Sequence, residues 1–571
     1  MRIKILRLAV GVPLLIIWSG LFYIQALRGS YFHNLSVNNR IRIVPLEGQR
    51  GLIRDSHGVT LADNRLTFDI VVIPQDIRDK ELLFNFLSDV LSIPKKKLLQ
   101  LFWQRKLAPF APVVVAEDIS KSTAMIIEEN KYRFPGLYVQ ESFRRWYPFR
   151  AVGAHVVGYL GKIDQADEEK MQAYGYTQQS LIGKTGVEAY YDSFLHGKGG
   201  GLQIEVNSRG EQVQLLGIRE PERGDDIQLT IDYRIQKSAA QILGDKPGAI
   251  IVMNLGNGAI LGQVSSPTYD PNIFVDSRVT QDEISVLTNP NAPLLNRAIK
   301  GLYPPGSVFK TIVTIAALDL GKISTYTSFL CKGYYQLGRR QFGCSHTHGT
   351  QNLIQAIAHS CNVYFFNVGD LLGPDVMNKY ANLFGLGSLT HIDLPFEEKG
   401  MVPGRLQRKL KRGEGWYKGD TLNYSIGQGD LLVTPLQLLC MMATVARNGD
   451  EVQPHLIEKI GSQEIINLAT VRHVAAKPEA YKIVQTGLQA AVEDNEGTAH
   501  LLNDLGLGIW GKTGTAQAGQ GKEHHSWFVG YNTKGKNKIV FCVFLEHGGA
   551  SYNACVLAKQ LLDDLVGQEI L

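Results

Sequence analysis

A run of twenty residues without a formal charge, at positions 8–27, constrains this chain more than any other feature of its sequence. Twenty apolar residues are enough to cross a lipid bilayer as an α-helix. The preceding segment, 1–7, carries three basic residues, which stay on the cytoplasmic side, so we expect the remainder of the chain to be exported. A cleaved signal peptide is the alternative, although Gln25-Ala26-Leu27-Arg28 lacks the small residues of a cleavage site. The sequence therefore predicts one transmembrane helix and an exported body.

The exported body is long enough for several domains. A glycine-rich loop at 197–201 is followed by a new apolar pattern at 225–232, which indicates a boundary. We therefore expect a stalk at 28–225 and a C-terminal domain at 226–571. The net charge of +5 is small for 571 residues and does not indicate nucleic-acid binding.

The stalk sequence predicts strands and short helices but no catalytic cluster. Residues 38–46 alternate between apolar and polar side chains like a strand, and residues 50–64 predict strand, turn and strand, with the turn at 55–58. Residues 78–133 have the pattern of short amphipathic helices. The basic and aromatic segment Phe143–Pro148 is expected to form a strand edge or an interdomain contact, because the chain is exported.

In the C-terminal domain, Ser307 and Lys310 combine a nucleophile with a base. The loop Pro304–Gly306 precedes an apolar helical stripe, so Ser307 is expected near a helix N-terminus, where free backbone N–H groups favour negative charge. Residues three apart share one helix face, so Lys310 is expected to point at the Ser307 hydroxyl. A desolvated lysine loses its proton more easily and can then activate the serine.

Two further motifs follow in order. Ser360-Cys361-Asn362 lies between helical stretches, and Lys512-Thr513-Gly514-Thr515 precedes the alternating run Trp527–Tyr531, which predicts two neighbouring antiparallel strands. Each motif also occurs elsewhere by chance, as at Ser92–Lys95 and Lys184–Gly186. Only the set in the C-terminal domain has all three motifs in one order.

This order of motifs resembles the serine acyl-transferases that react with penicillin. The stretches Asn296–Ala298, Ser425–Gly429 and His525–Gly530 are similar to those of class B penicillin-binding proteins, and the similarity covers the whole chain. It is greatest to the elongation-specific branch, penicillin-binding protein 2. The resemblance implies an α/β penicillin-binding domain: an antiparallel sheet flanked by helices, with Ser307 on a central helix. An elongated β-rich stalk of the dimerisation or pedestal type would precede it.

The activity implied by this resemblance is that of a peptidoglycan D,D-transpeptidase in cell elongation. Ser307 would attack the penultimate carbonyl of a stem peptide ending in D-Ala-D-Ala and release D-Ala; an amino group of a neighbouring stem would then accept the acyl group. Water in place of the amine would give a D,D-carboxypeptidase side activity. Lys310 would take the Ser307 proton, Ser360 would pass a proton to the leaving amine, and Asn362 would bind the substrate amide.

The third motif would bind the substrate by the same resemblance. Lys512, Thr513 and Thr515 would hold the terminal carboxylate, and Gly514 would let the substrate backbone pass close to the strand. The backbone N–H groups of Ser307 and Thr515 would form an oxyanion hole. This chemistry requires no cofactor. The implied partners are stem peptides, β-lactams and a membrane glycosyltransferase of the SEDS family, similar to RodA, together with other elongation proteins.

Cys331, Cys344, His348 and Cys361 form a separate group of chemically active side chains. Three thiolates and an imidazole complete a tetrahedral zinc set with no open position, so such a zinc would be structural and would brace the active-site loop. His346 is an alternative ligand, although His348 better matches the family. A disulfide, favoured by an oxidising compartment, and three small buried residues are the other interpretations.

Three other classes of protein share parts of this pattern. A β-lactamase would use the same motifs but needs no membrane stalk, and no Glu-x-x-x-Asn segment for deacylation is evident between Ser360 and Lys512. A non-enzymatic β-lactam receptor would need further membrane spans to signal. A scaffold protein would not need complete catalytic motifs.

Overall fold

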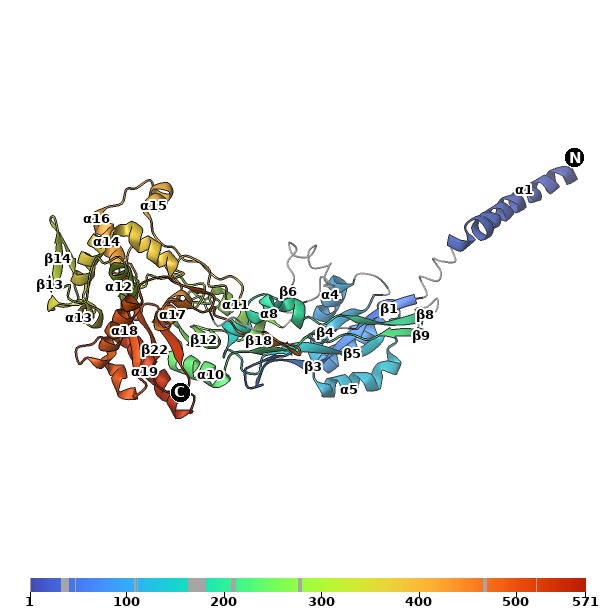
Figure 1. The fold of residues 1–571 in the computed structure, drawn as a ribbon. Helices are drawn as coiled ribbons and strands as arrows, with labels where there is room; N and C mark the ends of the chain where they lie inside the picture. Colours follow the sequence, from blue (N-terminus) through green and yellow to red (C-terminus); the bar gives the residue numbers. More distant parts are fainter. Residues whose placement is uncertain are drawn as a thin grey trace. The chain divides into compact units, whose positions relative to one another are not determined.

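The computed structural model describes residues 2–31, 41–46, 48–106, 109, 111–162, 181–206, 212–275, 280–465, 470–519 and 521–571. These residues form two compact units (Figure 1). The first unit gathers the described parts of Met1–Gly51, Asn64–Arg144 and His196–Gly224, and the second those of Leu52–Asp63, Arg145–Leu195 and Asp225–Leu571.

The chain begins with the expected apolar helix. Helix α1 (Arg2–Phe22) continues as a π-helical turn, η1 (Tyr23–Leu27). The window Val10–Leu27 is long and apolar enough to cross a membrane, and none of it is buried inside the protein. Exposed apolar side chains in such a row require another apolar surface to cover them, and a bilayer provides one.

The first unit contains two groups of strands. Strands β1 (Ile41–Leu46), β8 (Gly200–Val206) and β9 (Gln212–Arg219) form an antiparallel sheet in the order β1-β8-β9. β1 is part of the strand predicted at 38–46; residues 38–40 lie outside the described residues. The second group comprises the later part of β3 (Thr60–Val72) with β4 (Val113–Ile119) and β5 (Leu137–Trp146).

Helices pack on this second group and enclose a small core. They are α3 (Lys80–Leu91), α4 (Lys95–Arg105) and α5 (Lys121–Asn130), followed by the short turn η2 (Lys131–Arg133). Phe84 and Phe102 are fully buried in the core, with ring centroids 5.4 Å apart.

The expectation that 78–133 contains only helices is wrong at β4. Its three consecutive valines, 113–115, are β-branched and favour a strand.

The second unit is built on a five-stranded antiparallel sheet in the order β12-β11-β23-β22-β21, as expected. Strands β11 (Gly248–Asn254) and β12 (Ile260–Ser266) form a hairpin. The C-terminal strands are β21 (Ile509–Ala516), β22 (His525–Asn532) and β23 (Ile539–Leu545). All eight residues of β22 are buried, because helices cover both faces of the sheet.

Alternate residues of the sheet belong to two separate cores. Ile250 and Val252 pack with α10 (Tyr233–Leu243) and α19 (Ser551–Gly567), whereas Ala249 and Ile251 face the larger cluster on the other side. This larger cluster includes helix α12 (Lys310–Asp319), α14 (Asn362–Leu383), α17 (Pro435–Ala446) and α18 (Pro478–Glu493).

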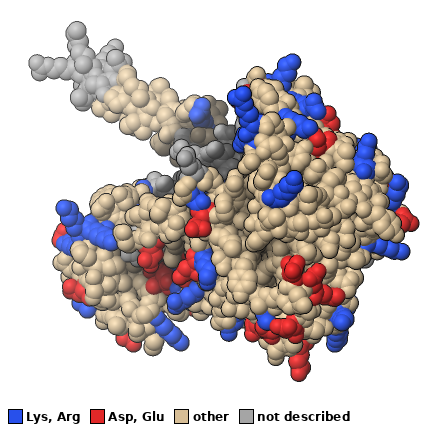
Figure 2. Space-filling model, turned by 90° about the vertical axis from the view of Figure 1, so that its left-hand side faces the viewer, with Lys and Arg blue, Asp and Glu red and all other residues tan. Residues whose placement is uncertain are grey.

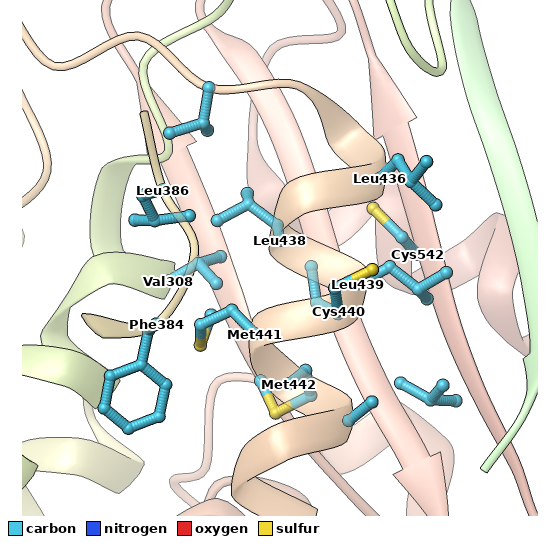
Figure 3. Packing of buried hydrophobic residues seen from close by; sticks show 14 of the residues in the cluster. Val308, Phe384, Leu386, Leu436, Leu438, Leu439, Cys440, Met441, Met442 and Cys542 are labelled. Atoms are coloured by element: carbon cyan, nitrogen blue, oxygen red, sulfur yellow. The ribbon is translucent and has the colours of Figure 1, made fainter. Parts of the chain in front are cut away.

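Helix α17 supplies much of this larger core. Pro435 to Val445 are all buried. Figure 3 shows Leu439 and Cys440 pointing toward the strands near Cys542, while Met441 lies toward Val308, next to Ser307 in sequence. The turn that carries Ser307 is therefore supported by tightly packed apolar side chains.

Smaller elements complete the second unit. In a short sheet, the start of β3 pairs with β2 (Ile53–Arg54), and β2 pairs with β10. On its other side β10 pairs with β18, which pairs with β19. Asp55 forms the predicted turn by accepting hydrogen bonds from the backbone N–H groups of His57 and Val59. The other elements are β6 (Leu160–Lys162), β7 (Leu181–Gly183), α6 (Ala154–Val157), α8 (Gly186–Tyr190), α9 (Asp192–Leu195), β10 (Ile227–Leu229), η3 (Pro271–Phe274), α11 (Gln281–Thr288), β13 (Phe329–Cys331), β14 (Tyr334–Leu337), β15 (Arg340–Gly343), β16 (Gly349–Gln351), α13 (Leu353–Ala358), α15 (Arg405–Arg412), α16 (Lys418–Ser425), β17 (Asp450–Glu451), β18 (Ile457–Ile460), β19 (Gln463–Glu464), β20 (Arg472–His473) and η5 (His500–Leu505).

Candidate active site

Ser307 lies on a short 3-10 turn rather than on the central α-helix itself. The turn η4 (Gly306–Phe309) leads directly into α12, which begins at Lys310. Gly306 has a φ of +55°, a left-handed conformation that glycine adopts without strain. Ser307 is half-buried between fully buried neighbours, so its hydroxyl is held by a rigid turn and is still accessible.

Three backbone segments pack closely around this turn. The Gly306 N–H donates to the Gly427 carbonyl at 3.0 Å, and a Cβ on Gly427 would lie 2.1 Å from the Gly306 carbonyl oxygen. A Cβ on Gly306 would lie 2.7 Å from the Thr515 oxygen. The indole N–H of Trp527 donates to the Pro304 carbonyl at 3.1 Å. The glycines at 306 and 427 therefore allow these segments to pack closely, which brings the first motif against the third.

The Lys310 ammonium joins the first motif to the second. Its Nζ donates to Asn362 Oδ1 at 2.7 Å, to the Ser360 carbonyl at 2.7 Å and to Ser360 Oγ at 3.2 Å. Burial lowers the pKa of Lys310 to about 8, against the opposing effect of nearby Cys344 and Cys361. A lysine in this environment loses its proton near neutral pH.

Lys310 was expected to point at the Ser307 hydroxyl, but its hydrogen bonds are made to other residues. Within the described ranges, the hydrogen bonds of the Lys310 ammonium go to the second motif, and none joins it to the Ser307 hydroxyl. Ser360 has a left-handed backbone, with a φ of +56°, and its carbonyl and hydroxyl oxygens both accept hydrogen bonds from the Lys310 ammonium. Helical spacing could not predict this contact, because it depends on a residue fifty positions away.

Two helices position the second motif. Asn352 caps α13 through a reciprocal capping box with Gln355, and the helix ends before Ser360. Cys361 is the N-cap of α14, and Asn362 is its first residue. The Asn362 amide also donates to the Gly343 carbonyl at 3.3 Å, so its oxygen is oriented toward Lys310.

The third motif lies on edge strand β21, which pairs with β22 as predicted. Lys512 is fully buried; its pKa is lowered well below its usual value by burial and by the charge of Lys310. Its ammonium donates to the Thr513 carbonyl at 3.3 Å. The Thr513 hydroxyl donates to Thr498 at 2.9 Å, whereas Thr515 is exposed. The motif thus begins with a buried lysine and ends with an exposed threonine on the same strand.

Gly514 has a packing role that its motif did not indicate. A Cβ at this position would lie 3.0 Å from the Pro305 carbonyl oxygen, 3.0 Å from Val308 Cγ2 and 3.2 Å from Trp527 Cβ. These atoms belong to the loop and turn around Ser307 and to the neighbouring strand. Glycine therefore allows the first motif to approach the third without displacing these atoms, whereas a Cβ would press on them.

Two contributing residues were not predicted as site residues. Gln428 donates from Nε2 to the Thr515 carbonyl at 3.4 Å, and Thr498 accepts from Thr513. The stretch Ser425–Gly429 that contains Gln428 was noticed as a family signature, without a role for its side chain. Nothing in the local sequence marks Thr498, which follows helix α18.

The cysteine group comes together beside the second motif. The ligand atoms of Cys331, Cys344, His348 and Cys361 all lie within 4.8 Å of one another. His348 Nδ1 is 3.6 Å from the Cys331 sulfur and 3.5 Å from the Cys344 sulfur, and the sulfurs of Cys344 and Cys361 are 4.0 Å apart. All three cysteines are free thiols, and His348 rather than His346 belongs to the group.

The chance repeats of the motifs lie in unrelated settings. Ser92 ends helix α3, and Lys95 begins α4, where it pairs with Glu81. Lys184–Gly186 connects β7 to α8. Neither belongs to the elements that carry the three motifs.

The family of the chain follows from these motifs and from comparison with known proteins. Residues 248–567 match the penicillin binding protein transpeptidase domain, and residues 45–229 match the penicillin-binding protein dimerisation domain. The chain belongs to the penicillin-binding proteins with a transpeptidase domain. Within this class, it is a peptidoglycan D,D-transpeptidase of the penicillin-binding protein 2 type.

Two relatives are named as peptidoglycan D,D-transpeptidases. The peptidoglycan D,D-transpeptidase MrdA of Acinetobacter baumannii is 33% identical over 97% of this chain and 85% of its own length. The Escherichia coli K12 protein of the same name is 30% identical over 97% of this chain and 93% of its own length.

Solved structures show the same fold. Penicillin-binding protein 2 of Helicobacter pylori, in a complex with MreC, has a TM-score of 0.83 at 28% identity, covering 93% of this chain and 99% of that one. The Pseudomonas aeruginosa protein, in complex with WCK 5153, has a TM-score of 0.70 at 29% identity, with coverages of 92% and 96%. A chain of a peptidoglycan synthase complex for polymerization and crosslinking has a TM-score of 0.75 at 28% identity, with coverages of 99% and 98%.

Proposed function

We propose that Ser307 is the nucleophile that forms the acyl-enzyme in peptidoglycan cross-linking. The observation that carries this assignment is the contact of Lys310 with Ser360 and Asn362, which brings two motifs together beside the Ser307 turn. Neutral Lys310 takes the Ser307 proton as the oxygen attacks the penultimate D-Ala carbonyl. The backbone N–H groups of Ser307 and Thr515 stabilise the oxyanion that forms, each worth roughly 3–4 kcal/mol in comparable sites.

Ser360 and Asn362 complete the first half of the reaction. Collapse of the tetrahedral intermediate breaks the peptide bond, and a proton passes through the Ser360 hydroxyl to the leaving amine of D-Ala. Ser360 Oγ lies 3.2 Å from Lys310 Nζ, so the proton taken from Ser307 can return by this route. Asn362 orients the substrate amide, and a stem-peptide amine then attacks the ester and regenerates Ser307.

The third motif holds the donor peptide. Lys512 supplies positive charge, and the Thr513 and Thr515 hydroxyls hydrogen-bond the terminal carboxylate. Thr515 is exposed and therefore available to the substrate. Gly514 lets the peptide backbone pass close to β21, in addition to its packing role on the other side. Every group in the reaction is a side chain or a backbone N–H, so no cofactor takes part in the chemistry.

We also propose that the cysteine group holds a structural zinc ion. Zinc bound at about 2.3 Å to sulfur and about 2.0 Å to nitrogen separates its ligand atoms by roughly 3.5–3.8 Å. The distances of 3.5, 3.6 and 4.0 Å around His348 and Cys344 are close to this. A disulfide between Cys344 and Cys361 would require their sulfurs to approach to about 2.05 Å. Cys361 caps α14, so the ion would brace the loop that carries Ser360.

The apolar helix and the relatives support a membrane-anchored enzyme. We propose that residues 1–7 lie in the cytoplasm, that 8–27 cross the inner membrane once and that the catalytic domain is periplasmic. The stalk at 28–225 and the transpeptidase domain at 226–571 remain our proposed division. A SEDS-family glycosyltransferase similar to RodA is the proposed polymerase partner, since one related chain was solved in a synthase complex for polymerization and crosslinking.

Mass spectrometry with labelled penicillin tests the nucleophile. The full chain in detergent is incubated with the label, digested and mapped; the adduct is expected on the peptide containing Ser307. Ser307→Ala is expected to abolish the adduct without changing the melting temperature. Ser92→Ala is the matched control, since Ser92–Lys95 repeats the motif in a different setting. An adduct that persists in Ser307→Ala would assign the nucleophile to another residue, and rapid release of the label would indicate a β-lactamase instead.

A further inference from the structure

Thr498 is a polar residue outside the three motifs that contacts two of the segments next to them. It lies in the loop after α18, half-buried between the exposed Glu496 and the buried Ala499. Figure 2 faces the end of the second unit where Figure 1 places α13 and α18, and it shows acidic and basic side chains on the surface. The loop therefore runs from a charged surface into the protein at Thr498.

Both hydrogen-bond donors of Thr498 go to one acceptor at the end of α13. Its backbone N–H and its hydroxyl each donate to the Ala358 carbonyl oxygen, at 3.2 Å in both cases. Ala358 is the last residue of α13, and the last four carbonyls of an α-helix have no partner within the helix. Thr498 therefore holds the C-terminal end of α13.

The Thr498 hydroxyl also joins this helix end to the third motif. A carbonyl oxygen can only accept, so the Thr498 hydroxyl proton is directed at Ala358. Its oxygen is then the acceptor for the Thr513 hydroxyl, at 2.9 Å. The hydrogen bonds thus run in one direction, from Thr513 through Thr498 to Ala358. A substrate carboxylate can take the Thr513 proton, and the bond from Thr498 to Ala358 then remains.

The end of α13 in turn sets the position of Ser360. This residue has a φ of +56°, a conformation that non-glycine residues keep only where the surrounding structure fixes it. The Ser360 N–H donates to the Ile357 carbonyl at 3.3 Å, and the Cys361 N–H donates to the Ala356 carbonyl at 3.0 Å. Both acceptors belong to α13, so a shift of this helix end would move the Ser360 hydroxyl.

The loop that carries Thr498 is held by contacts of its own. The Gly497 N–H donates to the Asp494 carbonyl at 2.9 Å, and the Ala499 N–H donates to the Ala491 carbonyl at 2.8 Å. Helices α18 and α13 are also closely packed, because a Cβ on Gly487 would lie 2.6 Å from Ile357 Cδ1. The Thr498 hydroxyl therefore serves its links to the two neighbouring segments, while backbone hydrogen bonds and packing hold the loop.

We propose that Thr498 is a positioning residue for the proton transfer by Ser360. In the proposed reaction Lys310, protonated by Ser307, donates to Ser360 Oγ while the Ser360 proton passes to the leaving nitrogen. This transfer requires Ser360 Oγ to stay beside the Lys310 ammonium, where it lies at 3.2 Å. Thr498 keeps it there by fixing the end of α13. The inference rests on the function proposed above for Ser360.

Two acylating compounds with different leaving groups test this role. The leaving nitrogen of penicillin needs a proton, whereas the thiolate of a thioester leaves without one. The full chain in detergent is acylated by penicillin and by a thioester of mercaptoacetate, which keeps a carboxylate for the third motif. Thr498→Val is expected to slow penicillin acylation about tenfold, part of the roughly 100-fold or more that a positioned acid contributes, and thioester acylation less than about twofold. Both rates come from one preparation, so their ratio does not depend on the folded fraction.

Three further variants separate positioning from folding. Thr498→Ser retains the hydroxyl and should restore most of the penicillin rate. Thr486→Val is the matched control, because this hydroxyl also donates to a carbonyl, that of Lys482 at 3.0 Å, but within α18; it should change neither rate. In a Ser360→Ala background, Thr498→Val should slow penicillin acylation by less than about twofold, because two residues that act through one group are not additive.

The ratio of the two rates decides the outcome. Equal slowing of both compounds by Thr498→Val would assign Thr498 to folding alone and overturn the inference. An unchanged penicillin rate in Thr498→Val, or a rate in Thr498→Ser as low as in Thr498→Val, would also overturn it, as would a loss that persists undiminished in the Ser360→Ala background. Absence of penicillin acylation at Ser307 in the parent would instead contradict the proposed function itself.

Discussion

Lys310 lies in an environment unlike that of an ordinary surface lysine. It is fully buried, and its ammonium contacts only polar atoms of the second motif among the hydrogen bonds of the described residues. Burial disfavours its charged form, which is why its pKa lies at about 8 rather than 10.5. The residue can therefore act as a base under physiological conditions.

The rate of penicillin acylation is expected to depend on this titration. Neutral Lys310 is the active form, so the second-order rate constant should rise as the pH increases through about 8 and level off above it. Measurement between pH 6 and 9.5 with a chromogenic β-lactam gives the profile. Lys310→Ala should lower the rate by at least 100-fold, the lower end of the contribution of a positioned base. A profile that falls with rising pH would contradict this role.

The space around Gly514 leads to a second prediction at this scale. In Gly514→Ala the new Cβ would press on the Pro305 carbonyl and Val308, and relief of such overpacking costs roughly 1–3 kcal/mol. Displacement of the Ser307 turn should slow acylation about tenfold, which corresponds to about 1.4 kcal/mol in the barrier. Gly567→Ala is the control, since nothing lies within 4 Å of its Cβ. An unchanged acylation rate would show that the turn does not depend on this contact.

Among the elements, helix α17 supports the sheet and the Ser307 turn. Leu439 is fully buried against the strands (Figure 3). Leu439→Ala should destabilise the second unit by about 2–5 kcal/mol through lost burial and the remaining cavity. Urea denaturation followed by tryptophan fluorescence measures the change, with Leu320→Ala, 45% exposed, as a control that should change stability by no more than about 0.5 kcal/mol. Equal effects of the two changes would contradict the described packing.

The cysteine group makes a prediction about the loop between α13 and α14. If zinc is bound, a chelator should lower the melting temperature by a few degrees or more, because binding energy contributes to folding. Cys331→Ala should abolish this sensitivity, whereas Cys440→Ala, also buried, should retain it. Elemental analysis should find about one zinc per chain. Protein purified without chelator that contains no zinc would reject the site.

The sequence predicted those elements whose signals are local. The pair β21–β22 follows from alternation of apolar residues, and helical stretches were expected on both sides of Ser360–Asn362, where α13 and α14 are found. Strand β4 was missed within a charged region that resembles amphipathic helices. Its pairing with β3 is set by tertiary contacts that the pattern of one segment does not contain.

The site was predictable as a set of residues but not as a geometry. Three ordered motifs and the cysteine group identify the residues of the candidate site, because their residue types and spacing are characteristic of the chemistry they perform. The hydrogen-bond partners of Lys310 and the packing of Gly514 depend on segments distant in sequence. Such contacts become visible only when the fold brings these segments together.

At the scale of the whole molecule, an apolar anchor, a dimerisation-type region and a transpeptidase domain occur in one chain. An anchored enzyme works at the membrane surface, where its lipid-linked substrate is made and where a polymerase can supply new strands. A full assay of the proposed activity therefore includes both a membrane and a polymerase.

Cross-linking in such a reconstituted system tests the central claim most directly. The full chain is combined with a SEDS-family polymerase and lipid-linked substrate, and cross-linked dimers and free D-Ala are counted by mass spectrometry. The parent should release one D-Ala for each cross-link, with a small excess from hydrolysis, and Ser307→Ala should release none while the polymerase continues. Cross-links formed by Ser307→Ala, or D-Ala released by the parent without any cross-link, would contradict a transpeptidase that acts through Ser307.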